Sequence, residues 1–258
     1  ICISTQIGCK MNCSFCMTGK QGFSGNLSSA EILNQILSVP ETQQLTNFVF
    51  MGMGEPFDNY QNLMSALEIM TAPYGFALSP KRITVSTVGI LPRLKQFLDK
   101  SRCHLAISIH SPFPEERLSM MPSEKAFPIK KILELLRQYD FSGQRRLSFE
   151  YIIFEGKNDG FEHAKELARL LKGMECRVNL IKFHSGDSRA VRWDSRLRGN
   201  DNTSSCHPRE GGDPNGSITA FRDFLNAKGI IATIRASRGE DISAACGLLS
   251  GQHNSANN

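Results

Sequence analysis

Three cysteines near the start of the chain are spaced for a metal-cluster site. Cys9, Cys13 and Cys16 form a CxxxCxxC motif directly before a glycine-containing turn. Three thiolates on one tight loop can hold three irons of a [4Fe–4S] cluster and leave the fourth iron open to another ligand. A structural zinc ion needs a fourth Cys or His nearby, and the nearest His in the sequence is His104. The motif therefore predicts an iron–sulfur cluster, with zinc as the alternative.

The remaining cysteines support a cofactor site over a disulfide scaffold. The chain has eight cysteines, and four of them lie in the first 16 residues. Disulfide scaffolds are typical of short secreted chains, whereas such clustering in a medium-sized chain indicates a metal or cofactor site in a reducing compartment. We expect a cytoplasmic protein in which Cys103 and Cys176 are structural and Cys206 has no role.

Composition narrows the class of protein. The 258 residues are 40% apolar and 21% charged, which is ordinary for one large or two small globular domains. No apolar run approaches the roughly 18 residues of a membrane span, so we expect no membrane association. A net charge of +5 permits an anionic partner such as nucleic acid. Because the chain begins at Ile1 and shows no signal peptide, we expect it to be a piece of a longer protein.

Strand-like and helix-like segments alternate along the chain. Six short, β-branched or aromatic segments are predicted strands, and five segments with apolar residues at helical spacing follow them. The predicted strands are Ile1–Thr5, Asn47–Met51, Arg82–Ser86, His104–Ile109, Leu147–Phe154 and Val178–Phe183. The predicted helices are Ser28–Val39, Asn62–Met70, Leu91–Asp99, Ile129–Tyr139 and Phe161–Leu171.

This order predicts an α/β fold with a parallel sheet and right-handed crossovers. Six units fall short of the eight of a closed barrel, so we predict a partial (β/α)6 TIM-like barrel, with an open doubly wound sheet as the alternative. A helix at Ser217–Lys228, a strand at Gly229–Arg235 and a short helix at Ile242–Leu249 are expected to complete it.

Residues 186–216 lack the apolar periodicity of their surroundings. Asp194–Asp201 and Cys206–Asp213 can be encoded by nearly reverse-complementary DNA. We interpret 186–216 as an inserted disordered or loop segment that could be a translated palindromic repeat, with an ordinary family loop as the alternative. It separates the predicted barrel (1–185) from the remainder of the catalytic domain (217–251) and a tail (252–258).

Three separated motifs resemble one known family. CxxxCxxC after the first strand of a partial barrel resembles the radical S-adenosylmethionine (SAM) superfamily. Within it, Phe15–Phe23 (FCMTGKQGF), Met51–Pro56 (MGMGEP) and Arg238–Gly247 (RGEDISAACG) resemble the RlmN family of dual-specificity RNA adenine C2 methyltransferases. The related Cfr family of C8 methyltransferases shares the cysteines but typically has Ala where this chain has Pro56, and it ranks second.

The resemblance implies a cofactor site at the carboxyl ends of the strands. Cys9, Cys13 and Cys16 would ligate the [4Fe–4S] cluster, and its open iron would chelate SAM, which reductive cleavage converts to a 5′-deoxyadenosyl radical. The SAM site would be lined by Gly54, Glu55, Ser86, Ser108, Ile109, His110 and His184. Glu55 would face the amino group of SAM.

The resemblance also assigns two further cysteines. Adenine C2 is electrophilic, so direct transfer of a methyl cation is unfavourable. Cys246 would accept a methyl group from one SAM, and a second SAM would activate that methyl group for addition to adenine. Cys2 would help to remove the C2 proton, leaving a transient Cys2–Cys246 disulfide. The implied partners are 23S rRNA, tRNA and a reductant such as flavodoxin, and we expect a monomer.

The chain departs from the family in two places. The family has an Asn-Pro-x-Pro-Gly turn after the sixth strand, and His184 occupies the position of the Asn that contacts SAM. We also expect this chain to lack the N-terminal region that carries an RNA-binding domain and a catalytic Glu in the family. An inactive RNA-binding relic is therefore a competing interpretation, alongside the C8 methyltransferase.

The repeat hypothesis predicts an inverted repeat in the coding DNA of residues 194–213. Sequencing the gene and comparing the codons of Asp194–Asp201 with those of Cys206–Asp213 checks it. Codons without reverse complementarity would leave the ordinary family loop as the explanation.

Overall fold

The computed structural model describes residues 1–183 and 216–235. Its main element is a six-stranded parallel sheet in which the strands follow one another in chain order. The strands are β3 (Phe48–Phe50), β4 (Ile83–Thr87), β5 (His104–Ser108), β6 (Leu147–Ile153), β7 (Arg177–Lys182) and β8 (Ile231–Arg235).

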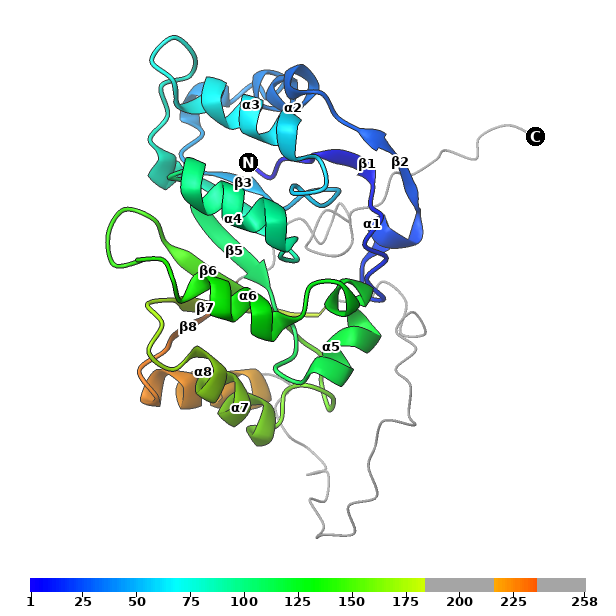
Figure 1. The fold of residues 1–258 in the computed structure, drawn as a ribbon, viewed down its shortest axis with the longest axis vertical. Helices are drawn as coiled ribbons and strands as arrows, with labels where there is room; N and C mark the ends of the chain where they lie inside the picture. The colour runs from blue at the N-terminus through cyan, green and yellow to red at the C-terminus, as the bar shows by residue number, and fades with distance from the viewer. Residues whose placement is uncertain (184–215, 236–258) are drawn as a thin grey trace, which may run out of the picture.

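Helices connect these strands and lie along one side of the sheet, as α4 and α6 show in Figure 1. The longer ones are α2 (Ser29–Leu37), α3 (Tyr60–Thr71), α4 (Leu91–Lys100), α5 (Pro114–Met120), α6 (Ile129–Leu136), α7 (Phe161–Leu171) and α8 (Gly216–Ala227). Shorter helices are α1 (Met17–Lys20), η1 (Thr42–Gln44), η2 (Pro80–Arg82) and η3 (Pro122–Lys125).

The strand order decides between the two predicted architectures. Right-handed crossovers between strands in unbroken chain order place every connecting helix on the same face. A doubly wound sheet requires the order to reverse at a switch point, and the order β3 to β8 has no reversal. The fold is therefore the predicted partial barrel, which is left open, and the doubly wound alternative is wrong.

The predicted first strand is not a member of the sheet as an element. Residues 1–5 run beside β3 and meet it at a single parallel bridge, Cys2 with Val49. Backbone hydrogen bonds from Ile3 N–H to the Val49 carbonyl (2.8 Å) and from Thr5 N–H to the Met53 carbonyl (2.9 Å) follow β3 and the loop after it. On its other side this segment is held by Gln35, which accepts a hydrogen bond from the Ser4 N–H and donates one to its carbonyl, both at 2.9 Å. The chain then enters β1 (Gln6–Gly8), which pairs antiparallel with β2 (Phe23–Asn26). The sixth strand of the sheet is β8.

The predicted helices are confirmed with shifts at their ends. Ser28 caps α2 through a reciprocal capping box with Glu31. The predictions missed α5, in which Pro114 occupies the first turn, where a missing N–H costs nothing. The helix expected at Ile242–Leu249 and residues 186–215 of the expected insert lie outside the described residues, and α8 begins at Gly216.

A continuous apolar core lies between the sheet and its helices. On β5, Leu105 and Ile107 are fully buried, and they belong to the same packed cluster as Leu94 of α4 and Ile132 of α6. This layer holds the strands in register, so the loops at their carboxyl ends have a rigid support. No helix in the described ranges is long and apolar enough to cross a membrane.

Ile107→Ala is expected to lower the free energy of unfolding by about 2–5 kcal/mol, because it leaves a cavity in a tightly packed core. Urea unfolding followed by circular dichroism measures the loss. The matched control is Ile7→Ala on β1, whose side chain is 52% exposed; its effect should stay within about 0.5 kcal/mol. Equal losses in the two variants would contradict this assignment of the core.

Candidate active site

The three cysteines of the CxxxCxxC motif line one cavity at the carboxyl ends of the strands. Their loop is held by backbone hydrogen bonds from Cys9 N–H to the Gly22 carbonyl (2.9 Å) and from Ser14 N–H to the Met120 carbonyl (2.9 Å). Cys16 is the N-terminal flanking residue of α1. The loop is thus fixed both to the β1–β2 hairpin and to the end of α5.

Gly8 allows the loop to close on the hairpin. Its φ of +79° lies in the left-handed region, and a Cβ at this position would stand 1.9 Å from the Gly22 carbonyl oxygen. Only glycine combines this backbone conformation with so close an approach. Because Cys9 is the next residue, Gly8 sets where the first thiol of the motif is placed.

The thiols of Cys9 and Cys13 are poor thiolates without a metal. Burial raises the pKa of Cys9 to about 11 and raises the pKa of Cys13 further. Bound iron reverses this preference because a coordinating thiol is deprotonated. Among the described residues, no three His, Cys, Asp or Glu side chains are gathered to hold a single metal ion.

Glu55 is buried at the edge of the same cavity, with 3% of its surface exposed. Its carboxylate accepts hydrogen bonds from Phe57 N–H (3.0 Å), the Thr87 hydroxyl (2.5 Å) and Val88 N–H (2.9 Å). Burial nevertheless outweighs these bonds and raises its pKa to about 7. A cationic or N–H-bearing ligand in the cavity would relieve this cost.

Most of the other predicted SAM residues line the cavity as well. Gly54, Ser86, Ser108 and His110 do so, from the ends of three neighbouring strands. The Ile109 side chain belongs to the apolar core instead. His184 lies outside the described residues, so its predicted contact stays a prediction.

His110 is held as a neutral imidazole. Its Nδ1 accepts a hydrogen bond from Ile152 N–H at 3.0 Å, so the proton sits on Nε2, which can donate. Burial and the charge of Arg117 lower its pKa to about 3. Asn158 Nδ2 donates to the His110 carbonyl at 2.8 Å, and Phe15 packs edge-on against the ring. The ring is thereby locked between the cysteine loop and β6.

Arg117 is a residue that the sequence did not reveal. It is fully buried on α5 and donates to the carbonyls of Val88 (3.2 Å), Ser108 (3.0 Å) and Ile109 (3.2 Å), while it forms an ion pair with Glu124. It therefore ties the ends of β4 and β5 together beneath the predicted SAM residues. An arginine in a helix with two neighbouring glutamates reads as solvent-exposed, which hid this role.

A second missed group lies deeper in the barrel. Glu150 on β6 accepts hydrogen bonds from Asn179 (2.8 Å) and Arg235 (3.4 Å), and it lines the cavity with Arg235. These residues come from three adjacent strands. Their polar character was readable in the sequence, but their meeting in the barrel interior depends on the strand register.

The described structure separates Cys2 from this set. Cys2 lies exposed on the segment beside β3 and is not among the residues that line the cavity. Cys246 lies outside the described residues, so the expected pairing with Cys2 and the transient disulfide remain predictions.

Comparisons with known proteins agree with the fold and the cysteine-lined cavity. The Radical SAM superfamily model matches residues 3–194. A probable dual-specificity RNA methyltransferase RlmN of Parabacteroides distasonis is 58% identical over 97% of this chain and 67% of its own length. The chain belongs to the RlmN family of the radical SAM superfamily.

Other members of the family agree. The RlmN of Syntrophus aciditrophicus is 40% identical over 97% of this chain and 68% of its own length. A solved radical SAM methyltransferase from Sphaerobacter thermophilus superimposes with a TM-score of 0.81 at 37% identity, over 96% of this chain and 69% of that one. The chain thus corresponds to about two thirds of a full-length RlmN.

Glu55 predicts a pH-dependent stability in the cofactor-free chain. Its pKa is about 7 in the folded state against an ordinary value of 4.5, so the folded state binds this proton more tightly. Its contribution to the free energy of unfolding is therefore fully present below about pH 4.5 and is lost as pH rises through about 7.

Urea unfolding of the native chain and of Glu55→Gln at pH 5 and pH 8 tests this. The free energy of the native chain minus that of the variant should be larger at pH 5 by at least about 1 kcal/mol. Glu55→Gln removes only the titration of Glu55, so the subtraction cancels the pH dependence of all other groups. The same difference at both pH values would show that Glu55 ionises normally.

Proposed function

We propose that this chain is the catalytic part of a radical SAM RNA methyltransferase that methylates C2 of adenine in 23S rRNA and tRNA. The observation that carries the proposal is the convergence of Cys9, Cys13, Cys16 and Glu55 on one cavity. Identity of 58% to a probable dual-specificity RNA methyltransferase supports the RNA substrates. The C8 methyltransferase alternative gains no support from these relatives.

In this proposal different residues of the cavity hold the [4Fe–4S] cluster and SAM. The three thiols would hold a [4Fe–4S] cluster, and the cavity beside them would hold SAM; together these groups supply the one-electron chemistry. Glu55 would accept a hydrogen bond from the amino group of SAM. Neutral His110 would donate from Nε2, and Ser86 and Ser108 would offer hydroxyls from the ends of β4 and β5.

The apolar part of the lining would exclude water from the reactive species. Phe15, Met121 and Ile152 line the cavity between the cysteine loop and β6. Phe15 and Ile152 also pack in a small buried cluster with Cys13. A dry cavity protects reactive intermediates from side reactions.

Methyl transfer would proceed through Cys246. The proposal rests on the motif Arg238–Gly247 and assigns Cys246 as methyl acceptor and Cys2 as the residue that helps to release the product. His184 would take the place of the Asn that contacts SAM in the family. A flavodoxin-type reductant would supply the electron.

Mass spectrometry of the chain after anaerobic reconstitution with iron, sulfide and SAM tests the proposal. We expect a methyl group on Cys246 in the native chain and none in Cys13→Ser, which removes a cluster ligand. Cys176→Ser is the matched control, because Cys176 is away from the cavity, and it should keep the methyl group.

Two results would contradict the proposal in different ways. A chain that binds the cluster and SAM but never methylates Cys246 would be the inactive relic. Adenine C2 methylation that survives in Cys246→Ala would exclude the two-stage route while leaving the reaction class intact.

A further inference from the structure

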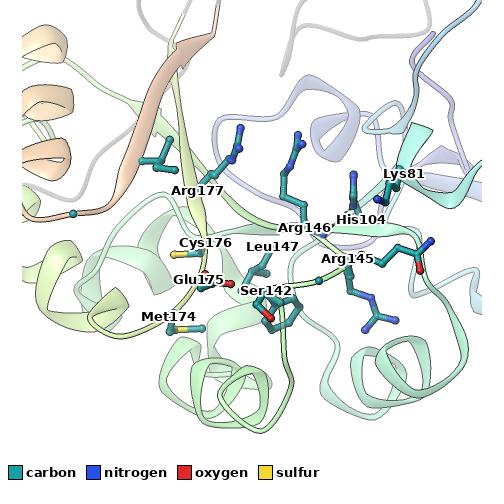
Figure 2. Close-up of a pocket in the computed structure, with 15 residues that line it drawn as sticks. Lys81, His104, Ser142, Arg145, Arg146, Leu147, Met174, Glu175, Cys176 and Arg177 are labelled. Carbon is teal, nitrogen blue, oxygen red and sulfur yellow. Dashed lines mark hydrogen bonds between the residues drawn. The ribbon is translucent and has the colours of Figure 1, made fainter.

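A second cavity opens at the opposite, amino-terminal end of the barrel strands. Its lining includes Lys81, His104, Arg145, Arg146 and Arg177 (Figure 2). One carboxylate, Glu175, also contributes to the lining. The cavity is therefore basic, in contrast to the cysteine-lined cavity at the carboxyl ends.

The basic groups come from the starts of four consecutive strands. Lys81 lies two residues before β4, His104 begins β5, Arg146 directly precedes β6 and Arg177 begins β7. Arg177 is paired in register with Ser148, and Arg146 lies two residues before Ser148 on the same face, so the two arginines are diagonal neighbours on adjacent strands. Figure 2 shows their side chains extending in the same direction.

These charges have no carboxylate partners in the described part of the chain. None of the ion pairs there includes Lys81, Arg146 or Arg177, and Glu175 forms none either. Arg145 differs, since it donates to the Leu98 carbonyl at 3.0 Å and lies over the Phe97 ring. Figure 2 shows Arg145 pointing away from the other two arginines.

The surroundings of His104 show that several positive charges lie close together in this cavity. It is buried, and its Nδ1 accepts a hydrogen bond from Arg146 N–H at 2.9 Å, which leaves the proton on Nε2. Its pKa is lowered by burial and by the charges of Arg146, Lys81, Arg145 and Arg177. The imidazole therefore stays neutral as a hydrogen-bond donor and adds no further repulsion.

We propose that this amino-terminal cavity is a phosphate-binding site in which Arg146 and Arg177 clasp one phosphate group and Lys81 adds charge beside it. Guanidinium groups bind phosphate through paired, charge-assisted hydrogen bonds. Two arginines on adjacent strands can approach one phosphate from two sides. An anion would also offset the mutual repulsion of the cluster.

The phosphate has two possible sources. It can be a small ion or nucleotide, or a phosphodiester of the RNA, and the latter rests on the proposed function. Arg146 lies four residues before Glu150, which lines the cofactor cavity, so at about 3.3 Å per residue this site is roughly 13 Å from the near wall of that cavity. An RNA phosphate bound here would thus belong to a nucleotide distant from the methylated one.

Isothermal titration calorimetry with inorganic phosphate, at constant ionic strength in chloride, tests the site directly. The double variant Arg146→Gln/Arg177→Gln should weaken phosphate binding by about tenfold or more. Lys130→Gln/Lys131→Gln removes the same charge from exposed positions on α6 and should leave binding unchanged. Thermal unfolding without phosphate verifies that both variants fold.

Binding of tRNA at several salt concentrations identifies the source. If the cavity takes RNA, the slope of log Kd against log[salt] should fall by about 0.7–0.9 in the arginine variant, the value for one lost phosphate contact, and by less in the lysine control. An unchanged slope with weakened phosphate binding assigns the site to small phosphates. Should no tRNA bind at all, RNA is excluded as the source for this chain, the calorimetry still decides the phosphate site, and the methyl group on Cys246 separately decides the proposed function.

The proposal is overturned if the arginine variant matches the lysine control in both phosphate and tRNA binding. It is equally overturned if the native chain binds no phosphate and its tRNA salt slope does not depend on Arg146 and Arg177.

Discussion

The unbroken chain order of the parallel sheet is the constraint on which the rest of this structure depends. It sends every crossover to one face, so the other face and both ends of the strands are left to side chains and ligands. All carboxyl ends meet at one edge, where Glu55, Ser86, Ser108 and His110 line one cavity although they are far apart in the sequence. The cysteine loop completes that cavity.

Buried charged side chains are the second feature on which the site depends. Arg117 is compensated by Glu124 and by three strand-end carbonyls, so its burial cross-links two strands beneath the cavity. Glu55 is only partly compensated, because three hydrogen bonds do not outweigh its desolvation. A buried charge whose partners are all in place supports the fold, whereas a buried charge that lacks a partner can be stabilised by a bound ligand.

The two ends of the barrel offer opposite chemistry. The carboxyl end combines thiols, a buried carboxylate and apolar walls, which suits a cluster and a sulfonium cofactor. The amino end collects cations that lack ion-pair partners within the described residues. Between them, Glu150, Asn179 and Arg235 fill the barrel interior with a hydrogen-bonded network. Each end can therefore bind its own class of ligand.

By itself, the sequence determined the local and covalent features. The spacing of Cys9, Cys13 and Cys16, the capping signal at Ser28 and the alternation of apolar segments depend only on neighbouring residues, and they predicted the cluster motif, the helices and the partial barrel. The motifs also determined the family, because matching stretches in order are a property of the chain alone.

Tertiary structure alone decided what depends on register and burial. Residues 1–5 run between β3 and Gln35, a residue distant in sequence whose side chain pairs with the backbone groups of Ser4. The burial of Arg117 and the proximity of Arg146 to Arg177 likewise arise from elements that meet only after folding. Charge in a sequence reads as solvent-exposed, and only packing shows which charges are buried, paired or gathered at one end of a sheet.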